Sequence, residues 1–291
     1  MKVSALHPVK KILVPTDFSK QSGETITYAA NLASRIDSKI ILYHAVHLPV
    51  LNPNEFAVAY SQEDLEQDSL AQLDALRDDI IENTGFTQID IVAEGGMAIS
   101  QICSYVRNHE IDLVIMGSHG AHGLGGLLMG CNTSDLIAKC SCPVLAVPYG
   151  IPFEIPEKIL FATNYADNDF QSIYLLTQYF KVFRPEIVIA HVEAKGNHSL
   201  EDKMMVWFRE QVQRNIPYDR IRFILLPAEN AVDALESHLE TEHYSLMATS
   251  MRSRNLFDYL TSRSLTKSMV KHTAIPLLAF HVVKASGTPL F

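Results

Sequence analysis

One stretch of the chain constrains its fold more than any other, the segment from Asp112 to Val147. It opens with an unbroken apolar run, Leu113 to Met116, of the kind that forms a buried parallel strand. Glycines follow at Gly117, Gly120, Gly123, Gly125, Gly126 and Gly130. After them, Cys131 to Ser134 form a polar cluster that is typical of a helix N-terminus. The segment therefore predicts a strand, a glycine loop and a helix start in series.

Such a series favours a bound anion. Glycines lack a Cβ, so backbone N–H groups can approach a ligand closely, and a helix start adds N–H donors at the positive end of its dipole. The loop lacks the Gly-Lys-Ser/Thr of the P-loop and the compact GxGxxG of dinucleotide folds. From the glycines alone, a long connection in which glycine serves only to make turns remains an open alternative.

The spacing of this loop is similar to that of a known family. The pattern Gly-x2-Gly-x9-Gly that begins at Gly117, and the Pro143-Val144 strand after the helix, resemble the nucleotide loop of the universal stress protein family. Lys11 to Ser19 resembles that family's first strand and Asp-bearing turn, and Leu42 to Ala45 the end of its second strand. The sequence departs from the pattern at Cys131, where the family has Ser or Thr.

The resemblance implies an adenine nucleotide in the first half of the chain, ATP or else AMP or ADP, together with Mg²⁺. Asp17 and the backbone at Ala45 would contact the adenine, Gly117 would face the ribose, and the later part of the loop would offer N–H groups to the phosphates. The candidate binding residues on this interpretation are Pro15, Thr16, Asp17, Ala45, Met116, Gly117, His119, Gly120, Gly130, Cys131, Asn132 and Thr133.

The first half alternates strands with helices in chain order. Strands are predicted over 12–15, 40–45, 89–93, 113–116 and 144–147, and helices over 19–36, 62–83 and 98–108. This order predicts an α/β fold with a doubly wound parallel sheet that is covered by helices on both faces. Ligands of such sheets bind beyond the carboxyl ends of the strands. Asp17, Ala45 and Gly117 all fall at such ends.

The second half repeats the first. Lys158 to Asn164 aligns on Lys11 to Asp17 with an offset of 147 (158 minus 11), and Pro276 aligns on Pro143 with an offset of 133 (276 minus 143). The chain is therefore predicted to form two tandem five-stranded, Rossmann-like domains, 1–150 and 151–291, that make a pseudo-dimer. We expect the last strand of each repeat to pair edge to edge with the other, because unpaired edges are sticky.

The repeats differ where a nucleotide would bind. With these offsets, the second repeat replaces Asp17, Gly117, Gly120 and Gly130 by Asn164, Ser250, Ser253 and Arg263. Side chains then occupy the space that phosphates need, so we expect the second repeat to have lost nucleotide binding while it still completes the pseudo-dimer. An alternative is that the basic residues of its loop, Arg252, Arg254 and Arg263, bind some other anion.

Bulk properties exclude several partners. The 291 residues carry a formal charge of -9, whereas a nucleic-acid backbone needs a basic surface. The sequence contains neither a signal-like apolar segment at its start nor an uncharged apolar run of roughly 18 residues. We therefore expect a cytoplasmic protein that binds neither nucleic acid nor membrane.

The four cysteines are expected to be free thiols, because none forms a CxxC pair. Cys103, Cys140 and Cys142 are predicted to pack in the core. Cys131 is different, because a cysteine at a helix N-terminus tends toward the thiolate, which would repel phosphate. Oxidation or alkylation of Cys131 as a control on nucleotide binding is one hypothesis.

Histidines offer a further alternative. His119 and His122 could share a zinc ion with Cys131, but the spacing shows no fourth ligand, and exposed loop histidines are the favoured interpretation, so no metal site is assigned. His44, which is flanked by strand residues, is predicted to be satisfied within the fold.

The leading functional hypothesis is a stress-related regulatory protein in which ATP occupancy of the first repeat alters assembly, including possible homodimers, or the choice of unidentified protein partners. The sequence shows neither a Ser-His-Asp order nor paired carboxylates that would form a catalytic set, so at most weak ATP hydrolysis is expected. The alternatives are a slow ATPase, a nucleotidyl or phosphoryl transferase, and an interaction scaffold without nucleotide.

Overall fold

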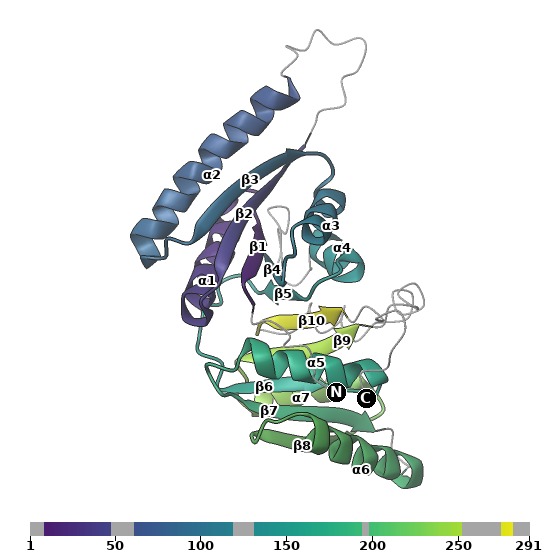
Figure 1. The fold of residues 1–291 in the computed structure, drawn as a ribbon. Helices are drawn as coiled ribbons and strands as arrows, with labels where there is room; N and C mark the ends of the chain where they lie inside the picture. The colour runs from purple at the N-terminus through teal and green to yellow at the C-terminus, as the bar shows by residue number, and fades with distance from the viewer. Residues whose placement is uncertain (1–8, 48–60, 119–130, 194–197, 252–274, 282–291) are drawn as a thin grey trace, which may run out of the picture.

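A computed structural model describes residues 9–47, 61–118, 131–193, 198–251 and 275–281. Those residues contain one continuous ten-stranded sheet with helices on both faces (Figure 1). Its strands are β1 (Lys11–Pro15), β2 (Lys39–Val46), β3 (Ile89–Gly95), β4 (Leu113–Gly117), β5 (Val144–Val147), β6 (Lys158–Ala162), β7 (Glu186–Glu193), β8 (Ile221–Pro227), β9 (Leu246–Met251) and β10 (Leu277–His281).

The helices of the described residues connect these strands. They are α1 (Lys20–Ile36), α2 (Gln62–Thr84), α3 (Ala98–Asn108), α4 (Cys131–Lys139), α5 (Asp167–Tyr179), α6 (His198–Asn215) and α7 (Ala231–Thr241). The helix start predicted after the glycine loop is confirmed, because α4 begins at Cys131. None of the helices within the described ranges is both long and apolar enough to cross a membrane.

The strand order divides the sheet into two equivalent halves. It runs β3-β2-β1-β4-β5-β10-β9-β6-β7-β8. Strands β1 to β5 with α1 to α4 form the first lobe, and strands β6 to β10 with α5 to α7 form the second lobe; all strand pairs within each lobe are parallel. In the first lobe the chain leaves β1 for β2 on one side and returns to β4 on the other, so the switch point lies between β1 and β4.

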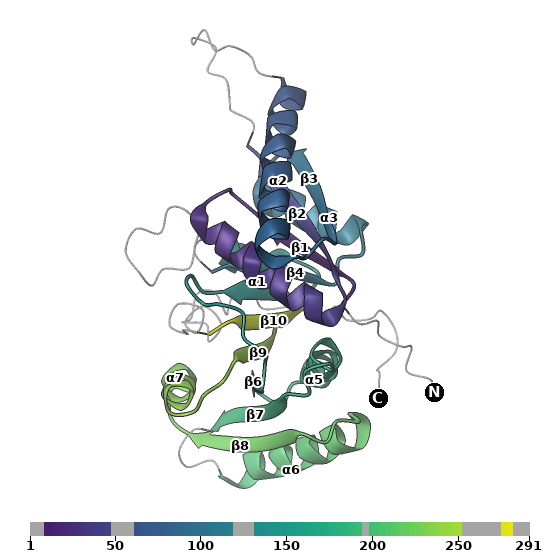
Figure 2. The same cartoon turned by 90° about the vertical axis from the view of Figure 1, so that its left-hand side faces the viewer.

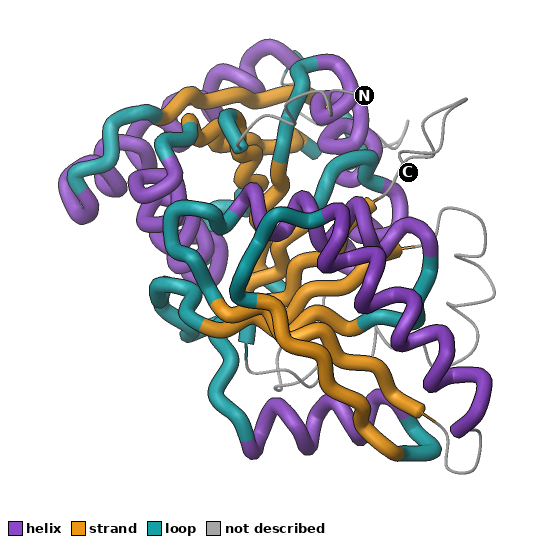
Figure 3. The backbone as a smooth tube through the Cα atoms, turned by 60° about the horizontal axis from the view of Figure 1, so that its bottom comes forward, coloured by secondary structure: helices purple, strands orange, loops and turns teal. Residues whose placement is uncertain are grey.

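The two lobes meet through one antiparallel strand pair. β5 and β10 pair with Leu277 opposite Ala146, Leu278 opposite Leu145 and Ala279 opposite Val144. The sheet therefore passes from one lobe to the other without an exposed edge between them, as the tubes of Figure 3 show. This confirms the predicted edge-to-edge pairing and the pseudo-dimer.

Strand pairing also confirms the internal repeat. Ile12 lies opposite Leu113 in the β1–β4 pair, and Ile159 lies opposite Leu246 in the β6–β9 pair. The first members of these pairs differ by 147 residues and the second members by 133, the two offsets read from the sequence. Both repeats thus build the same register around their switch points.

Helices cover the two faces in the same way in both lobes. Ile12 and Val14 of β1 face a core that includes α1, α2, α5 and α6, whereas Leu13 faces a second core with α3, α4 and α7. Figure 1 shows α1 and α2 on one side of the first lobe's strands and α3 and α4 on the other, and Figure 2 shows α5 and α7 on opposite sides of the second lobe's strands. Fully apolar strands are the expected result of burial on both faces.

Local sequence accounts for the ends of the first two helices. The Ser19 hydroxyl accepts a hydrogen bond from the backbone N–H of Ser22 and caps α1, which ends at Asp37 in the left-handed conformation (φ 55°). Ser61 and Asp64 form a reciprocal capping box at the start of α2. Gly85 follows α2 with φ 72°, a conformation that glycine adopts without steric cost.

The segment between the lobes packs on the first lobe. The ring of Phe153 lies 5.3 Å from that of Tyr28, and the guanidinium of Arg35 lies 5.1 Å from the Phe153 ring centre. On the other side, the Tyr179 hydroxyl of α5 donates to the Asp112 carbonyl oxygen at 2.9 Å. These contacts supplement the strand pairing and fix how the lobes sit on each other.

The junction between β5 and β10 makes a prediction for stability. Leu278 is 1% exposed and lies opposite Leu145. Replacing it, Leu278→Ala, should cost about 2–5 kcal/mol of unfolding free energy, because the cavity lies in a core shared by both lobes. Urea denaturation followed by circular dichroism measures this. The control Leu70→Ala removes a leucine that is 36% exposed on α2 and should cost less than about 1 kcal/mol. Equal losses in the two variants would contradict the prediction.

Candidate functional site

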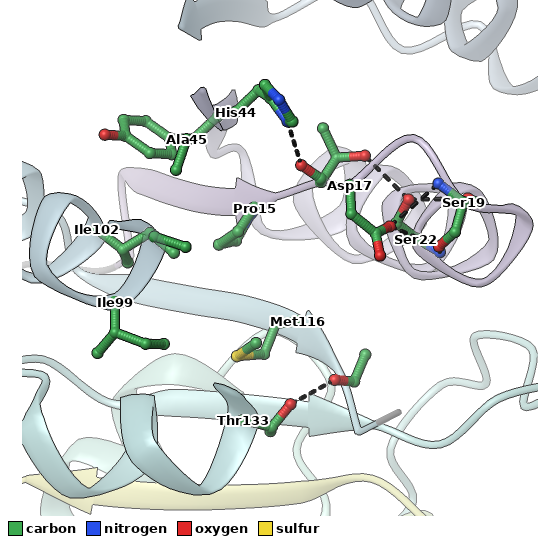
Figure 4. A pocket seen from close by; sticks show the side chains of 14 residues that line it. Pro15, Asp17, Ser19, Ser22, His44, Ala45, Ile99, Ile102, Met116 and Thr133 are labelled. Atoms are coloured by element: carbon green, nitrogen blue, oxygen red, sulfur yellow. Dashed lines mark hydrogen bonds between the residues drawn. The ribbon is translucent and has the colours of Figure 1, made fainter. Parts of the chain in front are cut away.

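A cavity of about 180 Å³ opens at the switch point of the first lobe (Figure 4). It lies at the carboxyl ends of β1, β2 and β4, where a doubly wound sheet places its ligands. Its lining residues are Pro15, Thr16, Asp17, Ser19, Ser22, Tyr43, His44, Ala45, Ala98, Ile99, Ile102, Met116, Gly117 and Thr133.

The turn between β1 and α1 supplies the polar wall of the cavity. The Asp17 carboxylate is exposed, and its Oδ1 accepts hydrogen bonds from the Ser19 backbone N–H at 3.0 Å and the Ser19 hydroxyl at 2.5 Å. Thr16 and Ser22 face each other with their hydroxyl oxygens 2.9 Å apart. The Phe18 backbone has φ 59°, which turns the chain sharply between strand and helix. Asp17 is thereby fixed at the cavity mouth.

His44 holds this turn from the neighbouring strand. Its Nδ1 lies 2.8 Å from the Thr16 carbonyl oxygen, and its ring lies 4.5 Å from that of Phe18. The prediction that His44 is satisfied within the fold is confirmed, although the residue also lines the cavity. Strand β2 therefore braces the β1–α1 turn. Ala45, the next residue of β2, also lines the cavity.

Tyr43 adds a second anchored group to the cavity wall. Its hydroxyl donates to Glu94 Oε2 at 2.8 Å, and its side chain is fully buried. Burial, followed by the hydrogen bond to Glu94, raises the pKa of Tyr43 far above its usual value. Tyr43 therefore stays neutral and acts as a rigid wall of the cavity.

The opposite wall is apolar. Ala98, Ile99 and Ile102 come from α3, and Met116 comes from β4. Figure 4 shows Ile99, Ile102 and Met116 across the cavity from Asp17 and Ser22. An apolar wall opposite a few fixed polar groups is typical of small-molecule sites.

The start of α4 closes the far end of the cavity. Thr133 is 2% exposed, and its hydroxyl donates to the Gly117 carbonyl oxygen at 2.8 Å. This bond ties the first turn of α4 to the last residue of β4. The helix N-terminus, which favours anions, is thereby held beside the cavity.

The structure brings together most of the predicted binding residues that lie within its described ranges. Seven predicted residues line the cavity together: Pro15, Thr16, Asp17, Ala45, Met116, Gly117 and Thr133. His119, Gly120 and Gly130 lie outside the described residues, and Cys131 and Asn132 are placed only by their backbone, at the start of α4. The assignment of ligand contacts to these residues stays a prediction.

Several lining residues were not among the candidates. Ser19 and Ser22 follow Asp17 in the Asp-bearing turn, so the turn itself was the signal that could have indicated them. Ile99 and Ile102 carry only a helical apolar pattern, which does not distinguish a cavity wall from the core.

The structure also bears on the predictions about the cysteines and a metal site. Cys103, Cys140 and Cys142 are buried, as predicted, and the sulfurs of Cys140 and Cys142 lie 3.6 Å apart. Within the part of the chain that the structure describes, no group of three or more His, Cys, Asp or Glu side chains is arranged to hold a metal ion. The zinc alternative involved His119 and His122, which lie outside that part.

Comparison with known sequences decides the family. Residues 8–148 match the model of the Universal stress protein family. The chain belongs to this family through its first half. A universal stress protein of Methanocaldococcus jannaschii is 27% identical over 154 residues, which cover 47% of this chain and 94% of that protein. A second universal stress protein of the same organism is 29% identical over 140 residues, covering 47% of this chain and 81% of that protein.

Solved structures extend the likeness of fold to both lobes. A universal stress protein from Archaeoglobus fulgidus aligns with 94% of this chain and 99% of its own, with a TM-score of 0.76 and 15% identity. A protein of unknown function from Pseudomonas aeruginosa aligns with 94% of this chain and 92% of its own, with a TM-score of 0.66 and 13% identity. At these identities the likeness concerns the fold alone. The tandem α/β architecture is thus shared with other chains of similar length.

The tie between α4 and β4 makes a testable prediction. Thr133→Val keeps the shape of the buried side chain but leaves the partly buried Gly117 carbonyl without its hydroxyl donor. We expect a loss of about 1–3 kcal/mol in unfolding free energy, measured by urea denaturation. The control Thr87→Val changes an exposed threonine and should stay within about 0.5 kcal/mol of the unsubstituted protein. A Thr133→Val protein as stable as its control would show that this bond does not hold the helix start.

Proposed function

We propose that this universal stress protein binds one adenine nucleotide, ATP, in the cavity of the first lobe and acts as a regulator without efficient turnover. The observation that carries the proposal is the meeting of a fixed carboxylate, an apolar wall and a helix N-terminus at one switch point. Family membership supports it, because the sequence resemblance to the nucleotide loop of that family covers the same lobe.

The cavity suits an adenine base. Asp17 presents its carboxylate at the mouth, where it can accept a hydrogen bond from an exocyclic amine. Ala45 also lines the cavity, and its backbone N–H and C=O would offer further hydrogen bonds to the base. Ile99, Ile102 and Met116 would pack against the faces of the base. The enclosed volume of about 180 Å³ is below the roughly 300–1,000 Å³ of complete ligand sites, so it fits the base, with the ribose and phosphates outside.

The phosphates would extend toward the start of α4. Its first-turn N–H groups and the positive end of its dipole favour negative charge, and Thr133 holds this helix start against β4. Gly120 and Gly130 would add backbone donors, and Mg²⁺ would supply charge neutralisation. Cys131 replaces a hydroxyl donor of the family pattern by a weak S–H donor, which would lower the affinity for phosphate.

The proposal of binding without turnover rests on the hydrogen bonds made by the titratable side chains that line the described cavity. These are Asp17, Tyr43 and His44. Tyr43 donates to Glu94, His44 Nδ1 contacts the Thr16 carbonyl, and Asp17 accepts from Ser19. Each helps to hold the wall or the turn, Asp17 through its Oδ1, and none of the three forms a nucleophile–base pair with another. ATP occupancy would then act through assembly or partner choice.

Calorimetric titration of the nucleotide-stripped chain with Mg-ATP tests the proposal. We expect one site per chain, with adenosine binding more weakly than ATP and GTP weaker still. The ligand panel includes AMP, ADP and cAMP, since a universal stress protein that is 20% identical over a match covering 47% of this chain has been solved with cAMP. Two sites would overturn the expectation that the second lobe has lost nucleotide binding, multiple turnover would favour the enzyme alternatives, and the absence of binding would favour a scaffold.

The substitution Asp17→Asn makes the prediction specific. It keeps the size of the side chain but removes the charge that accepts from the ligand amine, so we expect affinity for Mg-ATP to fall about tenfold or more, the loss of a charge-assisted hydrogen bond. The matched control is Asp37→Asn at the other end of α1, where φ is 55° and asparagine is well tolerated. Its affinity should equal that of the unsubstituted protein. Equal affinities for the two variants would remove Asp17 from the site.

A further inference from the structure

The turn that carries Asp17 has a close copy in the second lobe. Phe18 has φ 59° and the equivalent Tyr165 has φ 60°. His191 Nδ1 lies 2.9 Å from the Thr163 carbonyl oxygen, as His44 Nδ1 lies 2.8 Å from that of Thr16. The Tyr165 and His191 rings are 4.1 Å apart. The backbone of this turn and its histidine brace are therefore the same in both lobes, and a difference in binding at the turn would arise from its side chains.

The two turns place their buried and exposed carboxylates differently. In the first lobe, residue 17 is an exposed aspartate and residue 22 is a serine. In the second lobe, with the offset of 147, Asn164 takes the position of Asp17, and Asp169 takes that of Ser22. Asp169 is 2% exposed, so the charge that lies at the cavity mouth in the first lobe lies inside the turn in the second.

Asp169 binds the donors of its own turn. Its Oδ2 accepts the Thr163 hydroxyl at 2.6 Å and the backbone N–H groups of Asn164 at 3.3 Å and Ala166 at 3.2 Å. Burial raises the pKa of Asp169, while these hydrogen bonds oppose that rise. In the first lobe, the matching Thr16 hydroxyl accepts from the Phe18 backbone N–H, and the side chain that it meets at position 22 is the neutral Ser22 hydroxyl. The second turn thus has a buried carboxylate as acceptor at the position where the first turn has a neutral hydroxyl.

We propose that Ser22 is a specificity-determining residue: a neutral side chain at this position keeps the first cavity open to an anionic nucleotide, and Asp169 closes the equivalent position of the second lobe. This inference rests on the proposed function and names a further residue of the same site. Ser22 lines the cavity with Asp17 and Ser19, so a carboxylate there would stand next to the ligand.

Two physical effects act in the same direction. A carboxylate at position 22 would capture the Thr16 hydroxyl and compete with Asp17 for the Ser19 N–H, as Asp169 does for the matching donors. It would also add a second negative charge close to Asp17, and neighbouring carboxylates strongly disfavour each other's ionised forms. Asp17 could then no longer accept from the ligand freely, and the phosphates would meet added negative charge.

The loss of glycines in the second lobe is a separate reason to expect no nucleotide binding there. A substitution in the first lobe can distinguish this explanation from the effect of Asp169. Ser22→Asp changes the turn while Gly117, Gly120 and Gly130 stay in place. The fold should tolerate the change, because the second lobe accommodates an aspartate at the same position of the same turn. Position 22 is also in the first turn of α1, where an acidic side chain complements the helix dipole.

The experiment compares Ser22→Asp with Ser22→Asn by calorimetric titration with Mg-ATP. The two side chains have the same size and differ in charge, so a role of Ser22 in packing alone would give them equal affinities. We expect Ser22→Asp to bind at least about tenfold more weakly than Ser22→Asn, a difference of about 1.4 kcal/mol. Gln72→Glu, which adds the same charge on the exposed face of α2, should leave the affinity unchanged.

The possible outcomes separate this inference from the proposed function. If the unsubstituted chain binds no adenine nucleotide, the proposed function fails. If it binds and the two Ser22 variants have equal affinities, the inference fails while the function stands. If circular dichroism shows that Ser22→Asp does not fold, the same pair is compared in the Asp17→Asn background, which reproduces the residues that the second lobe carries. Weaker binding by the aspartate member supports the inference there, and equal affinities overturn it.

Discussion

The antiparallel pairing of β5 with β10 is the interaction on which the rest of the structure depends. It joins two parallel sheets into one and covers an edge that each lobe would otherwise expose. Strand β10 also reaches the first lobe through His281, whose Nε2 contacts the Ile137 carbonyl oxygen near the end of α4. Burial lowers the pKa of His281, so the ring contacts this carbonyl in its neutral form. The helix that begins beside the cavity therefore ends against the second lobe.

This connection gives the second lobe a role that does not require a ligand. Its strands retain the register and its turn retains the bracing histidine of the first lobe, yet Asp169 satisfies the turn internally. A buried carboxylate with several donors is stable only where those donors are fixed, and its removal would leave them unpaired. The second lobe thus uses the shared turn for its own stability, whereas the first lobe leaves the equivalent carboxylate exposed. One chain contains the same turn in a self-satisfied form and in a form that lines a cavity.

Much of the fold could be predicted from the sequence because it depends on local patterns. The helix over 98–108 was predicted with the bounds that α3 has, and the two repeat offsets match the strand register. The candidate site was harder to predict from the sequence. His44 was predicted to be satisfied, but its partner, the Thr16 carbonyl, is brought near only by the β1–β2 pairing. Likewise, Ile102 became a cavity wall and Cys103 a core residue of the same helix, because the packing of α3 decides which side chains reach the switch point.

The asymmetry between the lobes also bears on regulation. In a symmetric dimer of single domains, two equal sites fill over the same ligand range, and partly loaded species are populated between the empty and full states. Under the proposed function this chain has one site, and it would therefore have only an empty and a loaded state. Ligand binding stabilises the loaded state by RT ln(1 + [L]/Kd), and this free energy acts directly on the lobe that contains α4. Because α4 contacts both the cavity and β10, a change at the nucleotide would be felt at the junction of the lobes. The fused arrangement therefore suits a protein whose output is one change of surface per ligand bound.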